Sequence, residues 1–203
     1  MLDEAGLTHD ELNAAWSQAR SDAIAAAIRA AVPRLPHAMD YGCGPGHIGL
    51  RLLTYFDRLD LVDASADALA TASAATAGLA AVRTFTLDLT TQDAPELVDC
   101  AFASMSLHHI RDTDAVLAGL ARSIRPGGWL LVADLDADHG EFHCAEPDFV
   151  GLDGFDRHWL AERIAAHGFE SPVISDVWAG HRWSGPLLVD YSVFLIVARR
   201  ATR

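Results

Sequence analysis

The sequence has few cysteines and few positive charges. The three cysteines among its 203 residues, Cys43, Cys100 and Cys144, are odd in number and widely spaced. They form neither a disulfide framework nor a metal-ligand motif, so a reducing compartment fits best. Lys and Arg total 15 against 28 Asp and Glu, a net charge of −13. A surface of this sign repels phosphate backbones and anionic lipid, so we expect neither nucleic acid nor a membrane as a partner.

Long apolar runs are also missing. The longest aliphatic stretches, such as residues 192–198, are far shorter than the roughly 20 residues that cross a bilayer. The first ten residues are acidic and no apolar segment follows them, so we expect no targeting segment and a cytoplasmic location. Because 51% of the residues are hydrophobic, the chain is globular, and its length predicts one domain over residues 1–203.

The hydrophobic pattern divides this domain into three parts. Residues 14–32 are rich in alanine with apolar side chains at helical spacing, and Pro33 ends the pattern, so residues 1–35 are expected to form a helical N-terminal cap. Buried strands are expected at residues 37–41, 59–63, 81–87, 98–104 and 129–135, alternating with helices at 48–55, 67–77 and 113–124. This alternation predicts an open α/β sheet of parallel strands over residues 36–135, with a turn at 125–128 before the last strand.

The last part, residues 136–203, does not alternate in this way. Residues 136–154 lack periodicity and are expected to form a long loop or lid. A helix is expected at 156–167, ended by Gly168. The strand patterns at 172–178 and 191–198 have no helix between them, so they should form an antiparallel hairpin with a long loop at 179–190.

A glycine-rich loop directly follows the first expected strand. Gly42, Gly44 and Gly46 allow a sharp turn and let a ligand lie against bare backbone, although a tight strand-to-helix turn alone would also use them. A dinucleotide-binding fingerprint would need glycine at position 47, which is His47, and this argues against a nucleotide-dependent oxidoreductase.

Two carboxylates favour a ligand site over a simple turn. Asp63 ends the second strand, 21 residues after Gly42, where an acid can accept both hydroxyls of a ribose. Asp88 follows the third strand, where it can accept from an exocyclic adenine amine. The carboxyl ends of neighbouring parallel strands converge on one crevice, which is where open α/β sheets bind ligands.

Taken in order, these motifs resemble those of the class I S-adenosylmethionine-dependent methyltransferases. Within that class the chain is similar to the small-molecule group of ubiquinone and menaquinone methyltransferases. The matching pieces are Asp-x-Gly-x-Gly-x-Gly at 40–46, Leu-Val-Asp-Ala-Ser at 61–65, Leu-Asp-Leu at 87–89, the segment 99–109, the Arg-Pro-Gly-Gly turn and Gly-Phe-Asp-Arg at 154–157. The resemblance implies a doubly wound, seven-stranded, mostly parallel sheet with an antiparallel last strand, the Rossmann-like methyltransferase fold.

The resemblance also implies a cofactor site for S-adenosylmethionine. The three loop glycines would line its methionine end, with Asp40 near the amino group. Asp63 would bind the ribose, Ala64 would flank the adenine, and Asp88 with the Leu89 amide would contact the adenine edge. Ser104 would lie close to the sulfonium. Trp16 either caps the cofactor from the N-terminal helix or simply packs that helix.

The adjacent residues His108 and His109 are the candidate catalytic residues. Because neighbours in a regular element face different ways, at most one is expected to point into the crevice. That residue either takes a proton from the methyl acceptor or shapes the crevice. The pair has no third ligand at recognisable spacing, so we expect no metal.

Four other features are weaker candidates. His139 and His143 in the expected lid are possible substrate contacts, whereas Asp138 and Glu141 are expected to be solvated charges. Cys43 and Cys100 are expected to fill space in the loop and the core. The aromatic stretch at 178–183 is either a wall of the substrate pocket or an oligomer contact.

The sequence therefore predicts transfer of a methyl group to a small molecule by a monomer or a homodimer. A non-catalytic accessory protein that binds S-adenosylmethionine remains an alternative, because methyl transfer requires no obligatory side chain. An oxidoreductase that uses NAD or NADP is a weaker one.

Overall fold

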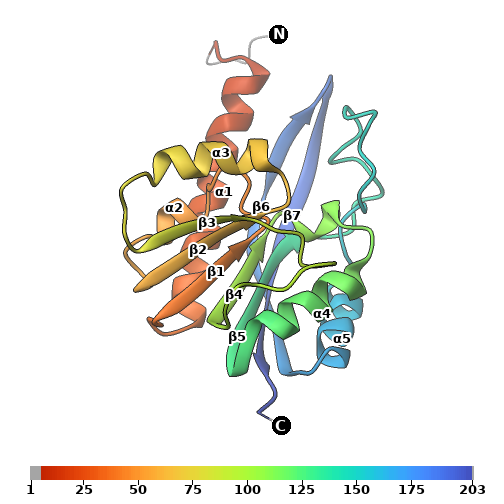
Figure 1. Ribbon diagram of the computed structural model, residues 1–203. Helices are drawn as coiled ribbons and strands as arrows, with labels where there is room; N and C mark the ends of the chain where they lie inside the picture. The colour runs from red at the N-terminus through yellow and green to blue at the C-terminus, as the bar shows by residue number, and fades with distance from the viewer. Residues whose placement is uncertain (1–5, 203) are drawn as a thin grey trace.

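The computed structural model describes residues 6–202, which form a seven-stranded sheet in the order β3-β2-β1-β4-β5-β7-β6 (Figure 1). β1 to β5 pair in parallel, and β7 runs antiparallel to both of its neighbours. The predicted α/β sheet with an antiparallel last strand is confirmed. The strands are β1 His37–Tyr41, β2 Arg58–Asp63, β3 Val82–Thr86, β4 Val98–Ser104, β5 Ile124–Leu135, β6 Phe169–Ser184 and β7 Leu187–Arg200.

Helices cover both faces of this sheet. α1 His9–Ala31, α2 Gly49–Leu52 and α3 Ala66–Ala75 pack on one face, and α4 Thr113–Ser123 and α5 Arg157–Ala166 pack on the other. A single 3-10 turn, η1 Leu107–His109, follows β4. The N-terminal helix begins five residues before the expected start, because Thr8 and Glu11 form a capping box there. Residues 1–5 of the expected cap lie outside the described residues.

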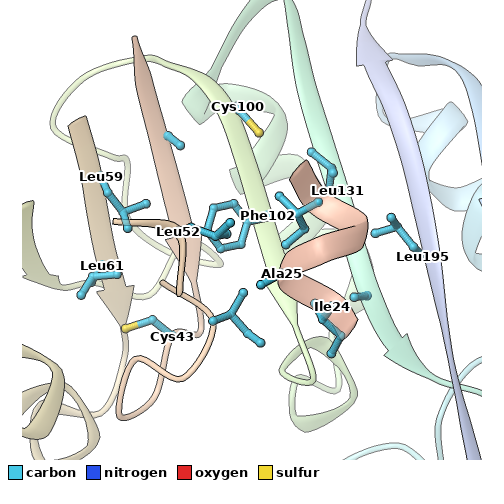
Figure 2. Packing of buried hydrophobic residues seen from close by; sticks show 14 of the residues in the cluster. Ile24, Ala25, Cys43, Leu52, Leu59, Leu61, Cys100, Phe102, Leu131 and Leu195 are labelled. Carbon is cyan, nitrogen blue, oxygen red and sulfur yellow. The ribbon is translucent and has the colours of Figure 1, made fainter. Parts of the chain in front are cut away.

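The core on the α1 face joins the N-terminal helix to the centre of the sheet. Figure 2 shows Ile24 and Ala25 of α1 beside Phe102 of β4, Leu131 of β5 and Leu195 of β7. Cys43, expected as filler of the glycine loop, and Cys100, expected in the core, are buried in the same cluster, and burial raises the pKa of both thiols. None of the described helices is both long and apolar enough to span a bilayer.

Two predictions of local structure are wrong, and both concern segments that contain glycine. The helix expected at 48–55 is only one turn long, Gly49–Leu52, because it has no side-chain N-cap and carries a glycine in its first turn. The turn expected at 125–128 is instead a bulge inside β5, which begins at Ile124 and pairs with β4 on both sides of the bulge. Gly127 permits this path with a φ of +77°.

The prediction of a long hairpin loop at 179–190 is also wrong. β6 and β7 stay paired to a tight turn at Gly185, which has a φ of +60°. The tip of the hairpin runs beside the first turns of α1 (Figure 1). There the Asn13 amide donates to the Trp183 carbonyl and accepts from the Trp183 N–H, both at 2.8 Å. Polar side chains at the tip line cavities rather than the core, which is why the strands carried no apolar alternation.

The packing of α4 predicts whether one substitution raises or lowers the free energy of unfolding. A Cβ at Gly119 would lie 2.0 Å from the carbonyl oxygen of Leu89. Gly119→Ala should therefore lower the free energy of unfolding by about 1–3 kcal/mol through overpacking, although alanine favours an isolated helix by about 1 kcal/mol. Urea unfolding of Gly119→Ala beside Ala118→Gly measures both effects. A Gly119→Ala variant more stable than the wild type would contradict this packing.

Candidate active site

The glycine loop after β1 lies against the end of β2. The N–H groups of Gly42 and Cys43 both donate to the Val62 carbonyl, at 2.8 and 3.1 Å. The Gly44 N–H donates to one carboxylate oxygen of Asp63 at 2.7 Å, and the Ser65 N–H donates to the other at 2.8 Å. These bonds fix the Asp63 carboxylate at the carboxyl edge of the sheet, and each oxygen keeps a lone pair for a ligand hydroxyl.

Beside this loop is a cavity of about 180 Å³, here called the β1 crevice. Its lining includes Arg20 of α1, Asp40, Gly44, Ser104 and Met105. The Ser104 hydroxyl and the Arg20 Nε are buried without a hydrogen-bond partner in the described chain. Unpartnered buried polar atoms are costly, so both groups are available to a bound ligand.

The three loop glycines have different surroundings. A Cβ at Gly44 would meet nothing within 4 Å, so its backbone faces open space, as a ligand cradle requires. A Cβ at Gly42 would lie 2.5 Å from the Cβ of Ser106, and one at Gly46 would lie 3.1 Å from the Cβ of Ala72. Gly42 and Gly46 therefore permit close packing inside the protein, and Gly44 has the position expected for ligand contact.

Asp40 is fully buried under the loop. Its Oδ2 accepts from the Gly49 N–H at 2.9 Å. Burial, with a smaller contribution from the negative charge of Asp63, raises the pKa of Asp40 to about 7. The crevice thus contains a carboxyl group that a bound cation would help to ionise.

The remaining predicted cofactor residues divide into two groups. Ala64 is exposed at the end of β2, and Asp88 is partly exposed, with its Oδ1 accepting from the backbone and hydroxyl of Thr90. Leu89, in contrast, is fully buried and its N–H donates to the Tyr41 hydroxyl at 3.3 Å. In this structure the protein itself uses this donor, and the contact of the Leu89 amide with a ligand stays a prediction.

A second cavity of about 270 Å³, here called the histidine pocket, adjoins the crevice. It is lined by Trp16, His108, His109, His143 and Tyr191 among others, and it shares Arg20 and Met105 with the β1 crevice. Trp16 therefore lies on the wall of this second cavity rather than in the crevice. Met105 at the junction has a left-handed backbone with φ of +54°, which is strained for a non-glycine residue.

The Asp134 side chain positions the backbone of residues 107–108 and the ring of His108. This carboxylate of β5 is fully buried, and its Oδ2 accepts from the N–H groups of Leu107 and His108. Its Oδ1 lies 2.5 Å from the Nδ1 of His108. A carboxylate accepts but does not donate, so Nδ1 carries the proton and His108 Nε2 presents a lone pair. That Nε2 is buried without a partner in the described chain.

Both adjacent histidines face the same pocket. The rings of His108 and His109 have centroids 4.3 Å apart and both line it. The expectation that at most one points inward is wrong, because residues 107–109 form a 3-10 turn rather than a regular helix or strand. His109 is exposed at its outer side, but partial desolvation in the pocket and the neighbouring histidines lower its pKa to about 4, so its ring is neutral near pH 7.

A third histidine comes from the irregular segment between β5 and α5. His143 is buried, stacks on Phe149 with centroids 3.7 Å apart, and holds its Nδ1 2.9 Å from the Oε2 of Glu146. Its Nε2, like that of His108, has no partner in the described chain. The sequence offered no third histidine at recognisable spacing, and the folded segment supplies one.

The same segment borders a larger, acidic cavity. This cavity of about 630 Å³ is lined by Asp136, Asp138, Glu141, Asp190 and His139, and it shares His181 and Tyr191 with the histidine pocket. Asp138 is more than a solvated charge, since it accepts from the N–H groups of Gly140 and Phe142. Within the stretch 178–183, His181 and Arg182 line the histidine pocket, which favours the pocket-wall hypothesis for those two residues.

Comparisons with known proteins agree with this arrangement. The family model described as "Methyltransferase domain" matches residues 39–130, from β1 into β5. An O-methyltransferase of Pyrenophora dematioidea is 32% identical over 121 residues, which cover 56% of this chain and 43% of that protein. The family match thus covers just under half of the chain, the part that contains the glycine loop, Asp63 and Asp88.

Solved structures of this methyltransferase fold superpose on nearly the whole chain. The YcgJ protein from Bacillus subtilis has a TM-score of 0.74 and 15% identity, covering 89% of this chain and 98% of that one. The N-methyltransferase NodS from Bradyrhizobium japonicum, in complex with S-adenosylhomocysteine, has a TM-score of 0.61 and 13% identity, covering 91% and 86%. The matches to curated methyltransferases cover less than half of those proteins. The narrower resemblance to ubiquinone and menaquinone methyltransferases stays a prediction.

The buried carboxyl group of Asp40 predicts a pH effect on stability. The pKa of Asp40 is raised from 3.8 to about 7, so the folded chain binds this proton more tightly than the unfolded chain does. The Asp40 carboxyl therefore becomes less favourable to folding as the pH rises through that interval. Asp40→Asn, which stays neutral, should gain in melting temperature relative to the wild type between pH 4 and pH 7, and the difference should level off above pH 7. An unchanged difference at pH 5 and pH 8 would contradict the raised pKa.

Proposed function

We propose that this chain binds S-adenosylmethionine in the β1 crevice and transfers its methyl group to a small molecule in the histidine pocket. One observation carries the proposal: the two cavities share Arg20 and Met105, so a donor in the first lies next to an acceptor in the second. The cofactor supplies a methyl group on a positively charged sulfur, which departs as a neutral thioether. Transfer then depends on placing the two partners in line.

Residues of the crevice, together with Asp63 and Asp88 beyond its lining, suit each part of the cofactor. Arg20 would pair with its carboxylate, and its buried Nε has no other partner in the described chain. Asp40 would accept from the amino group, whose positive charge favours the ionised carboxyl. Asp63, held at the end of β2, would accept from the ribose hydroxyls, and Asp88 from the adenine amine. Ser104 would lie near the sulfur.

The histidine pocket and the acidic cavity support a small acceptor. The two cavities measure about 270 and 630 Å³, within reach of the 300–1,000 Å³ typical of small-molecule sites. His108 and His109 are the proposed catalytic residues in this pocket, because both rings lie just past Met105. The Nε2 of His108, which has no partner in the described chain, would offer its lone pair to the acceptor.

The proposal treats residues 1–203 as one methyltransferase domain, in which 1–35 cap the site, 36–135 bind the cofactor and 136–203 enclose the acceptor. The net charge of −13 supports partners other than nucleic acid or membranes. The three cysteines are unpaired, which supports a reducing compartment, the cytoplasm.

Ligand-induced stabilisation tests this function against its alternatives. S-adenosylhomocysteine at 100 times its dissociation constant should stabilise the chain by about 2.7 kcal/mol, whereas NAD and NADP should not shift the melting temperature. Stabilisation by NAD and not by S-adenosylhomocysteine would contradict the proposal. Mass spectrometry of acceptor mixtures with labelled cofactor then separates an enzyme, which transfers the label, from an accessory protein that only binds.

The open space at Gly44 predicts a selective loss of binding. Gly44→Val would place a side chain inside the crevice and should weaken S-adenosylhomocysteine binding at least about 100-fold, or ~2.7 kcal/mol. Gly78→Val is the matched control, because Gly78 also has a positive φ and an open Cβ position but lies after α3. Calorimetry should show wild-type affinity for the control. Equal affinity of the two variants would place the cofactor elsewhere.

A further inference from the structure

The three histidines of the pocket bring their ring nitrogens close together. One nitrogen from each of His108, His109 and His143 lies within 4.8 Å of the other two. We propose that these three side chains bind a divalent transition-metal ion of the zinc type, with a fourth coordination position open to the histidine pocket. This inference deepens the proposed function and rests on it for the role of the ion, although binding of the ion can be tested alone.

The geometry is close to that of a three-histidine site. Zinc binds imidazole nitrogens at 2.0–2.1 Å, so tetrahedral ligands stand about 3.3 Å from each other. The rings would have to approach by at most about 1.5 Å from their present spacing. His109 is exposed and can rotate, whereas the other two rings are buried and already positioned.

Two carboxylates orient the buried rings as outer partners of a metal site do. Asp134 accepts from the Nδ1 of His108, and Glu146 accepts from the Nδ1 of His143. Each bond fixes the proton on Nδ1 and leaves Nε2 with a lone pair, which is the form that binds metal. Arg182, which also lines the pocket, is paired with the second oxygen of Glu146, so its charge is balanced.

The unpartnered nitrogens supply an independent observation. Nε2 of His108 and Nε2 of His143 are both buried without any hydrogen-bond partner in the described chain, on side chains that are 1% and 8% exposed. Buried polar atoms in proteins are almost always satisfied, and each exception calls for an unseen partner. A single ion between the rings would satisfy both lone pairs at once.

The donor set selects the kind of ion. Three neutral imidazoles suit zinc and related transition metals, whereas magnesium and calcium require oxygen ligands. Three histidines with one free position are the ligand pattern of catalytic rather than structural zinc sites. The same pocket is lined by Met105, which it shares with the cofactor crevice, so a ligand in the free position would lie near the cofactor.

An acceptor hydroxyl or thiol is the group that fits this position. Coordination would lower its pKa, and its proton would pass to water on the open side of His109. Its lone pair would form the new bond to the methyl carbon while that carbon's bond to the cofactor sulfur breaks, which leaves the neutral thioether. In this arrangement His108 holds the ion rather than accepting a proton.

Zinc binding by the whole chain tests the proposal. Equilibrium dialysis with metal analysis should find one tightly bound Zn²⁺ per wild-type chain, which Mg²⁺ does not displace. His109→Ala and His143→Ala should each raise the dissociation constant at least about 100-fold, and Glu146→Gln about 10-fold. His139→Ala removes a histidine of the same segment that lines the acidic cavity, and Cys144→Ser removes the exposed thiol beside His143. Both controls should bind zinc like the wild type.

Several results would overturn the proposal: a wild-type chain without bound zinc, equal affinity in the His109→Ala variant, or loss of zinc on Cys144→Ser. His109 is exposed, so its variant remains informative even where His143→Ala does not fold. S-adenosylhomocysteine binding, measured on the same samples with and without a chelator, should not depend on zinc. A chain that does not bind S-adenosylhomocysteine would contradict the proposed function. A chain that binds S-adenosylhomocysteine but not zinc would overturn the metal site alone.

Discussion

The buried carboxylate of Asp134 is the interaction on which the site depends. A charge in the core is tolerated only when hydrogen bonds surround it, and this one accepts from the N–H groups of Leu107 and His108, from the N–H of Leu135 and from the His108 ring. Because Asp134 lies on β5 and η1 follows β4, these bonds tie the ends of two neighbouring strands together. They fix the tight turn after Met105, and with it the boundary between the two cavities.

Much of the fold could be predicted from the sequence because the central strands are buried on both faces. Their short, mainly apolar segments predict β1 and β4 with the observed bounds. The hairpin could not be predicted in full, since the residues near its tip face cavities and α1 rather than the core and so carry no alternation. The bulge in β5 has a sequence of turn residues, and only the pairing with β4 shows that the strand continues through it.

Part of the site can be predicted because ligands of open α/β sheets bind at the carboxyl ends of the parallel strands. Asp63 could be predicted because it ends an expected strand, whereas Ser104 is implied only by the family resemblance. Asp134 has a similar place near the end of β5, but no sequence motif indicates it. His143 and Glu146 had no such signal. They lie in an irregular segment whose path is set by local contacts, such as the stacking of His143 on Phe149. The glycine loop is an intermediate case, because its sequence shows the turn but not which glycine faces open space.

A crystal structure of the chain with S-adenosylhomocysteine tests the central claim most directly. We expect the ligand in the β1 crevice, with its ribose on Asp63 and its sulfur beside Met105, facing the histidine pocket. A ligand bound in another cavity, or one whose sulfur points away from His108 and His109, would contradict methyl transfer in this pocket.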